Sequence, residues 1–142
     1  MPESPLLIIH LAFTLVMVGF IWTIQLVQYP IMARVPAEGF IAFERAHQRR
    51  VVGFLALFGV AEVVTAGWLF VAPGGLPRLP LGVAGALLAV IWVSTGLFFA
   101  PLHGRLAQGF DASLHRRLVA ANWLRTALWT ARGVVVLSLV WS

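Results

Sequence analysis

The 142-residue sequence contains no cysteine and no lysine, and it has few charges of either sign. Without cysteine the chain can form no disulfide bond, thiolate metal site or dithiol redox centre. Only 11% of the residues are charged, whereas soluble domains carry about 25%. In contrast, 61% of the residues are hydrophobic and the mean hydropathy is +0.94. This composition argues against an ordinary soluble domain and indicates an integral membrane protein.

Long apolar runs are separated by short polar segments, and each run is long enough for a transmembrane helix of about 20 residues. We predict spans over residues 6–27, 51–72, 81–100 and 118–140. Prolines and glycines in residues 73–80 predict a turn between the second and third spans. A chain of this length forms one domain. The predicted fold is therefore all-α, a single-domain transmembrane four-helix bundle.

The polar segment before the second span has a helical pattern of its own. Phe40, Phe43 and His47 recur at helical spacing among the charged side chains of residues 37–50. We therefore expect an amphipathic helix at the membrane interface that leads into the second span.

Arginines are distributed unevenly between the two sides of the predicted bundle. The side opposite the arginine-rich loops has only Arg78. The positive-inside rule then predicts a multi-pass protein of a bacterial inner (plasma) membrane with both termini outside the cytoplasm. The charge indicates contact with anionic lipids of the bilayer rather than with nucleic acid. The arginines of the predicted cytoplasmic side are Arg34, Arg45, Arg49, Arg50, Arg105, Arg116 and Arg117.

Two arginines lie inside the last predicted span. A charge at this depth usually faces a partner or a water-filled cavity. Glu62 lies ten residues before the end of its span, and Arg132 lies ten residues before Ser142. At 1.5 Å per residue both are roughly 15 Å from the outer boundary, so we predict that Glu62 faces Arg132 or Arg125. The helix face that carries these arginines consists of Asn122, Arg125, Trp129 and Arg132, which are three, four and three residues apart.

A second set of polar residues falls nearer the predicted cytoplasmic boundary and comes from all four spans or their edges. Convergence of side chains from facing helices is how bundles form substrate and cofactor sites. We therefore expect a polar interior site at this level. Its predicted members are Gln25, Tyr29, His47, Thr95, His103, Asn122 and Arg125.

Histidines make a metal site the first chemistry to consider. His47 and His103 both fall at the predicted cytoplasmic edge, and neutral imidazole binds transition metals and haem iron. Glu44 and His47 form a Glu-x-x-His pair, a spacing that di-iron bundles use twice but that occurs here once. Glu62 is about 22 Å from His47 along a straight helix, too far for one mononuclear site, so a site of Glu62 with His103 or His10 is geometrically easier. Alternatively, Glu44 is solvated beside the arginines and the histidines bond to backbone or water.

Three sequence stretches resemble a family of small uncharacterised bacterial membrane proteins. The stretches are WTIQLVQYP at 22–30, WVSTGLFFAPLHGRL at 92–106 and NWLRTALWTAR at 122–132, and His47 and Glu62 also fit the pattern. This resemblance covers nearly the whole chain and implies four transmembrane helices without an established activity. The architecture is also remotely similar to the anthrone-oxygenase-like membrane proteins, which would imply oxidation of an aromatic substrate.

The leading functional hypothesis is an oxidoreductase or oxygenase-like membrane protein that acts on a small lipophilic substrate, such as a quinone or an aromatic polyketide. His103 and His47 would bind a transition metal or haem, or act as acid and base. Arg125 and Arg132 would stabilise an oxyanion, and Glu62 would orient them or relay a proton. The predicted substrate-binding residues are Asn122, Gln25, Thr95, Trp129 and Tyr29.

Other function classes stay open. The chain would serve equally as a non-enzymatic accessory subunit whose arginine face binds a lipid headgroup or a partner helix. A small transporter is a third class, in which four spans would have to oligomerise, although the sequence has no inverted repeat. Glu62 and the arginines would also be explained by a purely structural ion pair that locks the bundle.

Overall fold

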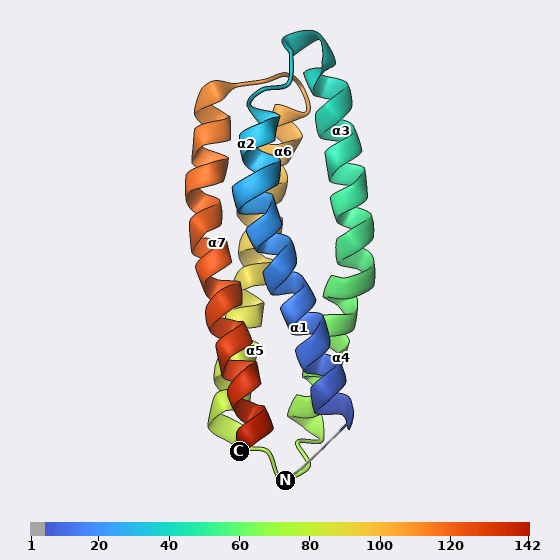
Figure 1. Cartoon of the computed structure of the whole chain (residues 1–142), viewed down its shortest axis with the longest axis vertical. Coiled ribbons are helices and arrows are strands. Elements are labelled where there is room, and N and C mark those ends of the chain that lie inside the picture. Colours follow the sequence, from blue (N-terminus) through green and yellow to red (C-terminus); the bar gives the residue numbers. More distant parts are fainter. Residues whose placement is uncertain (1–4) are drawn as a thin grey trace.

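Four long helices pack side by side in the computed structural model, which describes residues 5–142 (Figure 1). Helix 1 spans Pro5–Met32, helix 2 Ala37–Val71, helix 3 Arg78–Leu106 and helix 4 Ala112–Trp141. The shortest has 28 residues, about 42 Å, and exceeds the ~30 Å hydrocarbon core of a bilayer. Residues 5–142 include no strand. The all-α four-helix bundle and the multi-pass membrane assignment are confirmed.

Three of these helices contain a π-helical turn, and we keep separate labels for the segments on either side. Helix 1 consists of α1 (Pro5–Thr23), η1 (Ile24–Gln28) and α2 (Tyr29–Met32). Helix 2 consists of α3 (Ala37–Phe54), η2 (Leu55–Gly59) and α4 (Val60–Val71). Helix 3 consists of α5 (Arg78–Ser94), η3 (Thr95–Phe99) and α6 (Ala100–Leu106). Helix 4 consists of α7 (Ala112–Ser138) and a final 3₁₀ turn, η4 (Leu139–Trp141).

Proline accounts for two of the π-helical turns. Pro30 and Pro101 follow η1 and η3, each as the second residue of the next helical segment. A proline has no N–H to donate, and its ring collides with the carbonyl four residues earlier in a regular α-helix. The wider turn relieves this conflict, and the helix then continues. Helices 1 and 3 therefore continue past residues 27 and 100, where the predicted spans end, to Met32 and Leu106.

Each π-helical turn shifts the buried face of its helix by one residue. In helix 1 the buried residues Met17 and Ile21 are followed by Gln25 and Tyr29, at successive spacings of four. A regular helix that kept the spacing of α1 would place Gln28 inward instead. One residue corresponds to a rotation of about 100°, so η1 turns Tyr29 toward the bundle axis.

The predicted amphipathic helix forms and leads directly into the second span, and it packs against the other helices along its buried face. Residues 37–50 belong to α3, which continues through η2 into α4 as one helix of 35 residues. Phe40, Glu44 and His47 are its buried residues, so this face packs against the other helices. The predicted segment is therefore part of the bundle.

The outer surface is apolar, whereas the interior contains polar side chains. Val71, Leu97 and Trp68 are 83%, 79% and 66% exposed, as lipid-facing residues are in a bilayer. Polar groups inside a membrane bundle face one another or a cavity because lipid cannot hydrogen-bond to them. The buried polar residues are His10, Thr14, Gln25, Glu44, His47, Glu62, His115, Asn122, Arg125, Thr126 and Arg132.

Helices 1 and 4 pack against each other, and the start of α1 and the end of α7 lie at the same end of the bundle (Figure 1). Gly74 and Gly75 have positive φ angles in the turn between α4 and α5, where a side chain would be strained. Asp111 caps α7 by accepting hydrogen bonds from the backbone N–H groups of Ser113 and Leu114. The Ser113 hydroxyl, together with these N–H groups, lowers the pKa of the Asp111 carboxyl.

Candidate active site in the bundle interior

The interior polar residues form two groups at different heights. The ion-pair cluster consists of His10, Thr14, Glu62, Thr65 and Arg132, toward the end of the bundle where α7 terminates. The polar cavity lies farther from that end, at the level of the π-helical turns. Trp129 connects them, since its ring lines the cavity and its indole N–H lies 3.5 Å from Glu62 Oε2.

In the ion-pair cluster, Arg132 has an acceptor from each of the other three helices. Its guanidinium is paired with Glu62 on helix 2 and donates to the Thr14 hydroxyl on helix 1 at 2.8 Å. Its Nε donates to the Ala84 carbonyl on helix 3 at 3.2 Å. Both charged side chains are completely buried. Of the two pairings that depth allowed, the structure therefore has Glu62 with Arg132.

His10 completes this cluster in a defined tautomer. Its Nε2 faces Arg132 Nη2 at 3.0 Å, and because arginine only donates, Nε2 must accept. The proton then resides on Nδ1, which donates to the Thr65 hydroxyl at 2.7 Å. Thr65 in turn donates to the Ala61 carbonyl at 2.8 Å. The cluster is internally satisfied and links all four helices.

The polar cavity has a volume of about 160 Å³ and lies among helices 1, 2 and 3 with α7 behind it. Each π-helical turn contributes to its wall through Ile24, Leu55 or Thr95. Single π-helical turns occur frequently at functional sites. Val52, which is 63% exposed, also lines the cavity, so the cavity reaches the lipid-facing surface beside Val52 on helix 2.

Arg125 is the charged group of the helix 4 wall. Its Nε donates to Asn122 Oδ1 at 3.0 Å, and its Nη1 donates to the Thr95 hydroxyl at 3.3 Å. Its guanidinium carbon lies 4.0 Å from the centre of the Phe99 ring. Among residues 5–142 no carboxylate forms an ion pair with it. Asn122 is itself held by a 2.7 Å hydrogen bond to Gln25, so these two amides position Arg125.

A carboxylate from helix 2, an imidazole from helix 3 and a phenol from helix 1 form a hydrogen-bonded chain beside the cavity. Glu44 Oε1 lies 2.7 Å from His103 Nδ1, and the Tyr29 hydroxyl lies 3.3 Å from His103 Nε2. Glu44 is fully buried and also accepts a hydrogen bond from Gln48 at 3.0 Å. His103 and Tyr29 line the cavity. With Nδ1–H donating to the carboxylate, His103 presents a basic Nε2 toward the cavity side.

The alternative in which Glu44 is solvated beside the arginines is therefore wrong, because its side chain is fully buried. The π-helical turn after Thr95 rotates α6 so that His103 meets Glu44, and Gln48 fixes the carboxylate from one turn away. Sequence reasoning also gave no role to Gln48 or the threonines of the ion-pair cluster, whereas it placed Trp92 in the interior, where it lines the cavity. A signal was available for Glu44, because Phe40, Glu44 and His47 share one helix face.

The predicted metal ligands His47 and His103 do lie next to each other, with ring centroids 5.4 Å apart. His47 Nδ1 bonds to the amide of Gln28 at 3.2 Å. Residues 5–142 contain no group of three or more histidine and acidic side chains arranged to hold a metal ion. Two imidazoles are fewer than the three protein ligands of a catalytic zinc site. A metal or haem role for this pair stays a prediction.

The predicted site residues divide between the polar cavity and the ion-pair cluster. Most of them line the cavity, two belong to the ion-pair cluster, and two are amides that position Arg125. Those in the cavity wall are Tyr29, His47, Thr95, His103, Arg125 and Trp129; those of the ion-pair cluster are Glu62 and Arg132; the two amides are Gln25 and Asn122.

Gly59 provides a test of the cavity wall. A Cβ atom there would lie 2.7 and 2.8 Å from two ring atoms of Trp92, which lines the cavity. We expect Gly59→Ala to displace the indole and to lower stability by about 1–3 kcal/mol, as overpacking does. Gly53→Ala is the matched control on the same helix, since its Cβ would contact nothing within 4 Å. Thermal unfolding of both variants in detergent checks this, and equal stability would contradict the close contact.

Comparisons with protein-family models, curated proteins and solved structures find no match to the chain. The two resemblances therefore stay hypotheses, and the helical bundle is the part of them that the structure supports.

Proposed function

We propose that this membrane protein binds a small lipophilic molecule in the polar cavity and catalyses a proton transfer on it. The observation that carries this proposal is the Glu44–His103–Tyr29 chain, which ends at a mostly apolar cavity inside the bundle. A carboxylate that orients an imidazole is the arrangement by which many enzymes prepare a general base.

The proposed step uses three groups of this chain. The substrate loses a proton, from a hydroxyl or from a carbon next to a carbonyl, to Nε2 of His103, directly or through the Tyr29 hydroxyl. The imidazolium that forms is stabilised by the buried Glu44 carboxylate. The negative charge left on the substrate oxygen is stabilised by Arg125 in a surrounding of low polarity.

This proposal retains part of the oxidoreductase or oxygenase-like hypothesis. Oxidation of a phenol, hydroquinone or enolisable ketone begins readily from its deprotonated form. The site supplies that deprotonation, whereas the oxidation itself would require an electron acceptor or dioxygen in addition. A quinone-like or aromatic carbonyl compound therefore remains the favoured substrate class.

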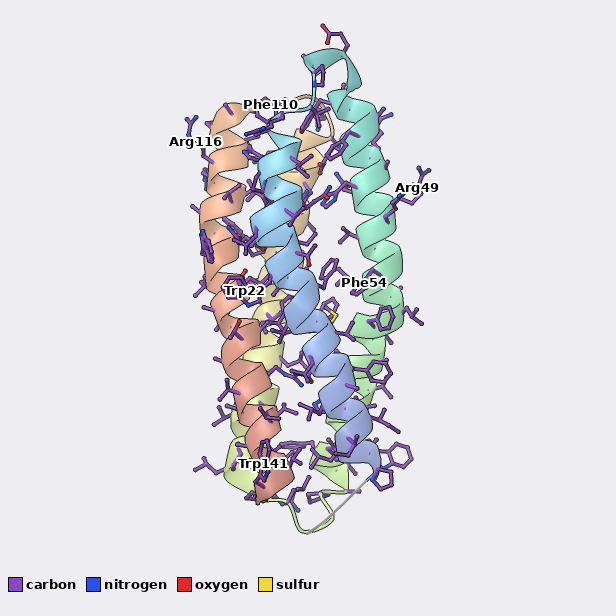
Figure 2. All side chains as sticks on the ribbon, viewed as in Figure 1. Trp22, Arg49, Phe54, Phe110, Arg116 and Trp141 are labelled. Atoms are coloured by element: carbon purple, nitrogen blue, oxygen red, sulfur yellow. The ribbon has the colours of Figure 1, made fainter. Side chains whose placement is uncertain are left out.

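We further propose the inner membrane of a bacterium, with the arginine-rich end in the cytoplasm. Figure 2 labels Arg116 near one end of the bundle, with Arg49 pointing outward from α3, and Trp141 at the opposite end. Apart from the interior Arg125 and Arg132, only Arg78 lies toward the Trp141 end among the arginines of residues 5–142. Positive charge on one side favours that side in the cytoplasm.

The test is hydrogen exchange of 2-tetralone, a two-ring ketone with acidic C–H groups. The purified protein in phosphatidylcholine nanodiscs is incubated with it in D₂O, and NMR follows loss of the C–H signals. We expect faster exchange than with empty nanodiscs. Binding of the ketone without faster exchange would favour the non-enzymatic binding protein over the enzyme.

A further inference from the structure

We infer that Arg125 binds the acidic oxygen of the ligand, so that the cavity accepts lipophilic acids as their anions. This inference rests on the proposed function for the location of the ligand, but not for the reaction. It names the class of ligand: a compact, mostly apolar molecule with one carboxylate, enolate or phenolate oxygen.

The two interior arginines of α7 supply the first argument. Arg132 is fully buried, is paired with Glu62 and has neutral acceptors from helices 1 and 3. Arg125 is also buried, at 9% exposure, yet its hydrogen bonds to Asn122 and Thr95 are to neutral groups. A buried charge without a counter-charge is unfavourable, and in a bilayer it generally marks a ligand or ion site. An anion in the cavity would supply the missing charge.

The position of Arg125 is fixed before any ligand arrives. Asn122 holds its Nε, Thr95 holds Nη1, and the Phe99 ring supports its guanidinium. Arginine carries five N–H donors, so these two bonds leave others for a ligand in the cavity that it lines. A guanidinium held in this way loses little side-chain entropy on binding.

Trp92 provides a second, independent indication. Its ring lines the cavity, and its indole N–H is buried with no hydrogen-bond partner among residues 5–142. A buried donor is normally satisfied, by protein, water or ligand. The cavity thus offers a cation and an unsatisfied neutral donor, both of which suit oxygen acceptors on a ligand.

The size of the cavity limits the ligand. A cavity of about 150 Å³ holds one benzene ring, and this cavity measures about 160 Å³. One substituted ring therefore fits inside. A longer apolar chain would extend through the opening beside Val52 into the lipid.

Two probes of matched shape test the inference: 4-butylbenzoate, an anion at neutral pH, and 4-butylbenzyl alcohol, which is neutral. Their binding to the protein in nanodiscs of uncharged phosphatidylcholine is measured by calorimetry, with empty nanodiscs subtracted. We expect the acid to bind about tenfold or more tightly than the alcohol, because hydrogen bonds to a charged partner are strong. Equal affinities in the wild-type protein would overturn the inference without any variant.

Variants then locate the preference. Arg125→Gln is expected to bring the two affinities within about twofold, and Arg125→Lys to retain part of the preference. Arg117→Gln, an exposed site on the same helix, removes the same charge and should leave the preference unchanged. A preference that survives Arg125→Gln in a folded protein would assign the anion to another group.

A His103→Gln variant separates this inference from the proposed reaction. The inference requires that this variant still prefer the acid over the alcohol. If wild-type protein selects the acid but does not accelerate 2-tetralone exchange, the anion site stands and the proposed reaction fails. If it accelerates exchange without selecting the acid, the reaction stands and the anion site fails.

Discussion

His103→Gln is expected to reduce the catalysed exchange of 2-tetralone by about 10²- to 10⁴-fold, the usual contribution of a general base. A glutamine side chain can accept the hydrogen bond from Tyr29 but cannot take up a proton near neutral pH. Ketone binding depends on the apolar wall, so the loss should appear in kcat with little change in KM. Loss confined to KM would mean that His103 only shapes the cavity.

Glu44→Gln tests the carboxylate of the same chain. The amide oxygen still accepts from His103 Nδ1, so the imidazole keeps its orientation, but the negative charge that stabilises the imidazolium is lost. We expect a smaller reduction in kcat than for His103→Gln. Glu38→Gln is the control, because it lies exposed on the same helix and removes the same charge. Equal activity of both variants would remove Glu44 from the mechanism.

Separation of Glu62 from Arg132 is expected to have the largest effect on stability. Glu62→Gln leaves a buried guanidinium without its counter-charge, and Arg132→Gln leaves a buried carboxylate without its own. Each should lower the free energy of unfolding by about 3–5 kcal/mol. Reversible unfolding in mixed micelles, followed by circular dichroism, measures this change. A loss below about 1 kcal/mol for both would show that solvent or lipid already satisfies these groups.

The double variant Glu62→Gln/Arg132→Gln decides what the ion pair is for. Its destabilisation should be smaller than the sum of the single variants, by about 0.5–3 kcal/mol, because neither charge is then left alone. If this folded double variant also keeps the exchange activity, the ion-pair cluster is a packing device. If stability recovers and activity does not, the cluster contributes to the reaction, through Trp129 or otherwise.

The sequence predicted the helices and the depth of the charges because both follow from hydrophobicity and helical rise. Glu62 pairs with Arg132, one of the two arginines that the depth argument allowed. The surroundings of the polar cavity were harder to predict from the sequence. In the sequence Glu44 lies among arginines, which favours a solvated carboxylate. Only the packing of α3 against α6 makes Glu44 part of the interior.

The π-helical turns are the reason for most of the remaining differences. The predicted spans over residues 6–27 and 81–100 end just before Pro30 and Pro101, because proline usually marks the end of a helix. In a membrane bundle, neighbouring helices and local π turns let the helix continue past the proline. The spacing from Ile21 to Gln25 to Tyr29 records the shift, and it was visible before the structure.

The π-helical turns also have a genetic consequence. Each is equivalent to one inserted residue, so a single codon separates each of three helices from a regular α-helix. The half of the bundle that holds the Glu62–Arg132 pair keeps its register whether or not those codons are present. In helices 1, 2 and 3 the segment on the other side of the turn is rotated about its own helix axis, which brings Tyr29 and His103 inward, whereas α7 contains no such turn. A bundle with Tyr29 and His103 facing inward thus differs by three codons from one built of regular α-helices.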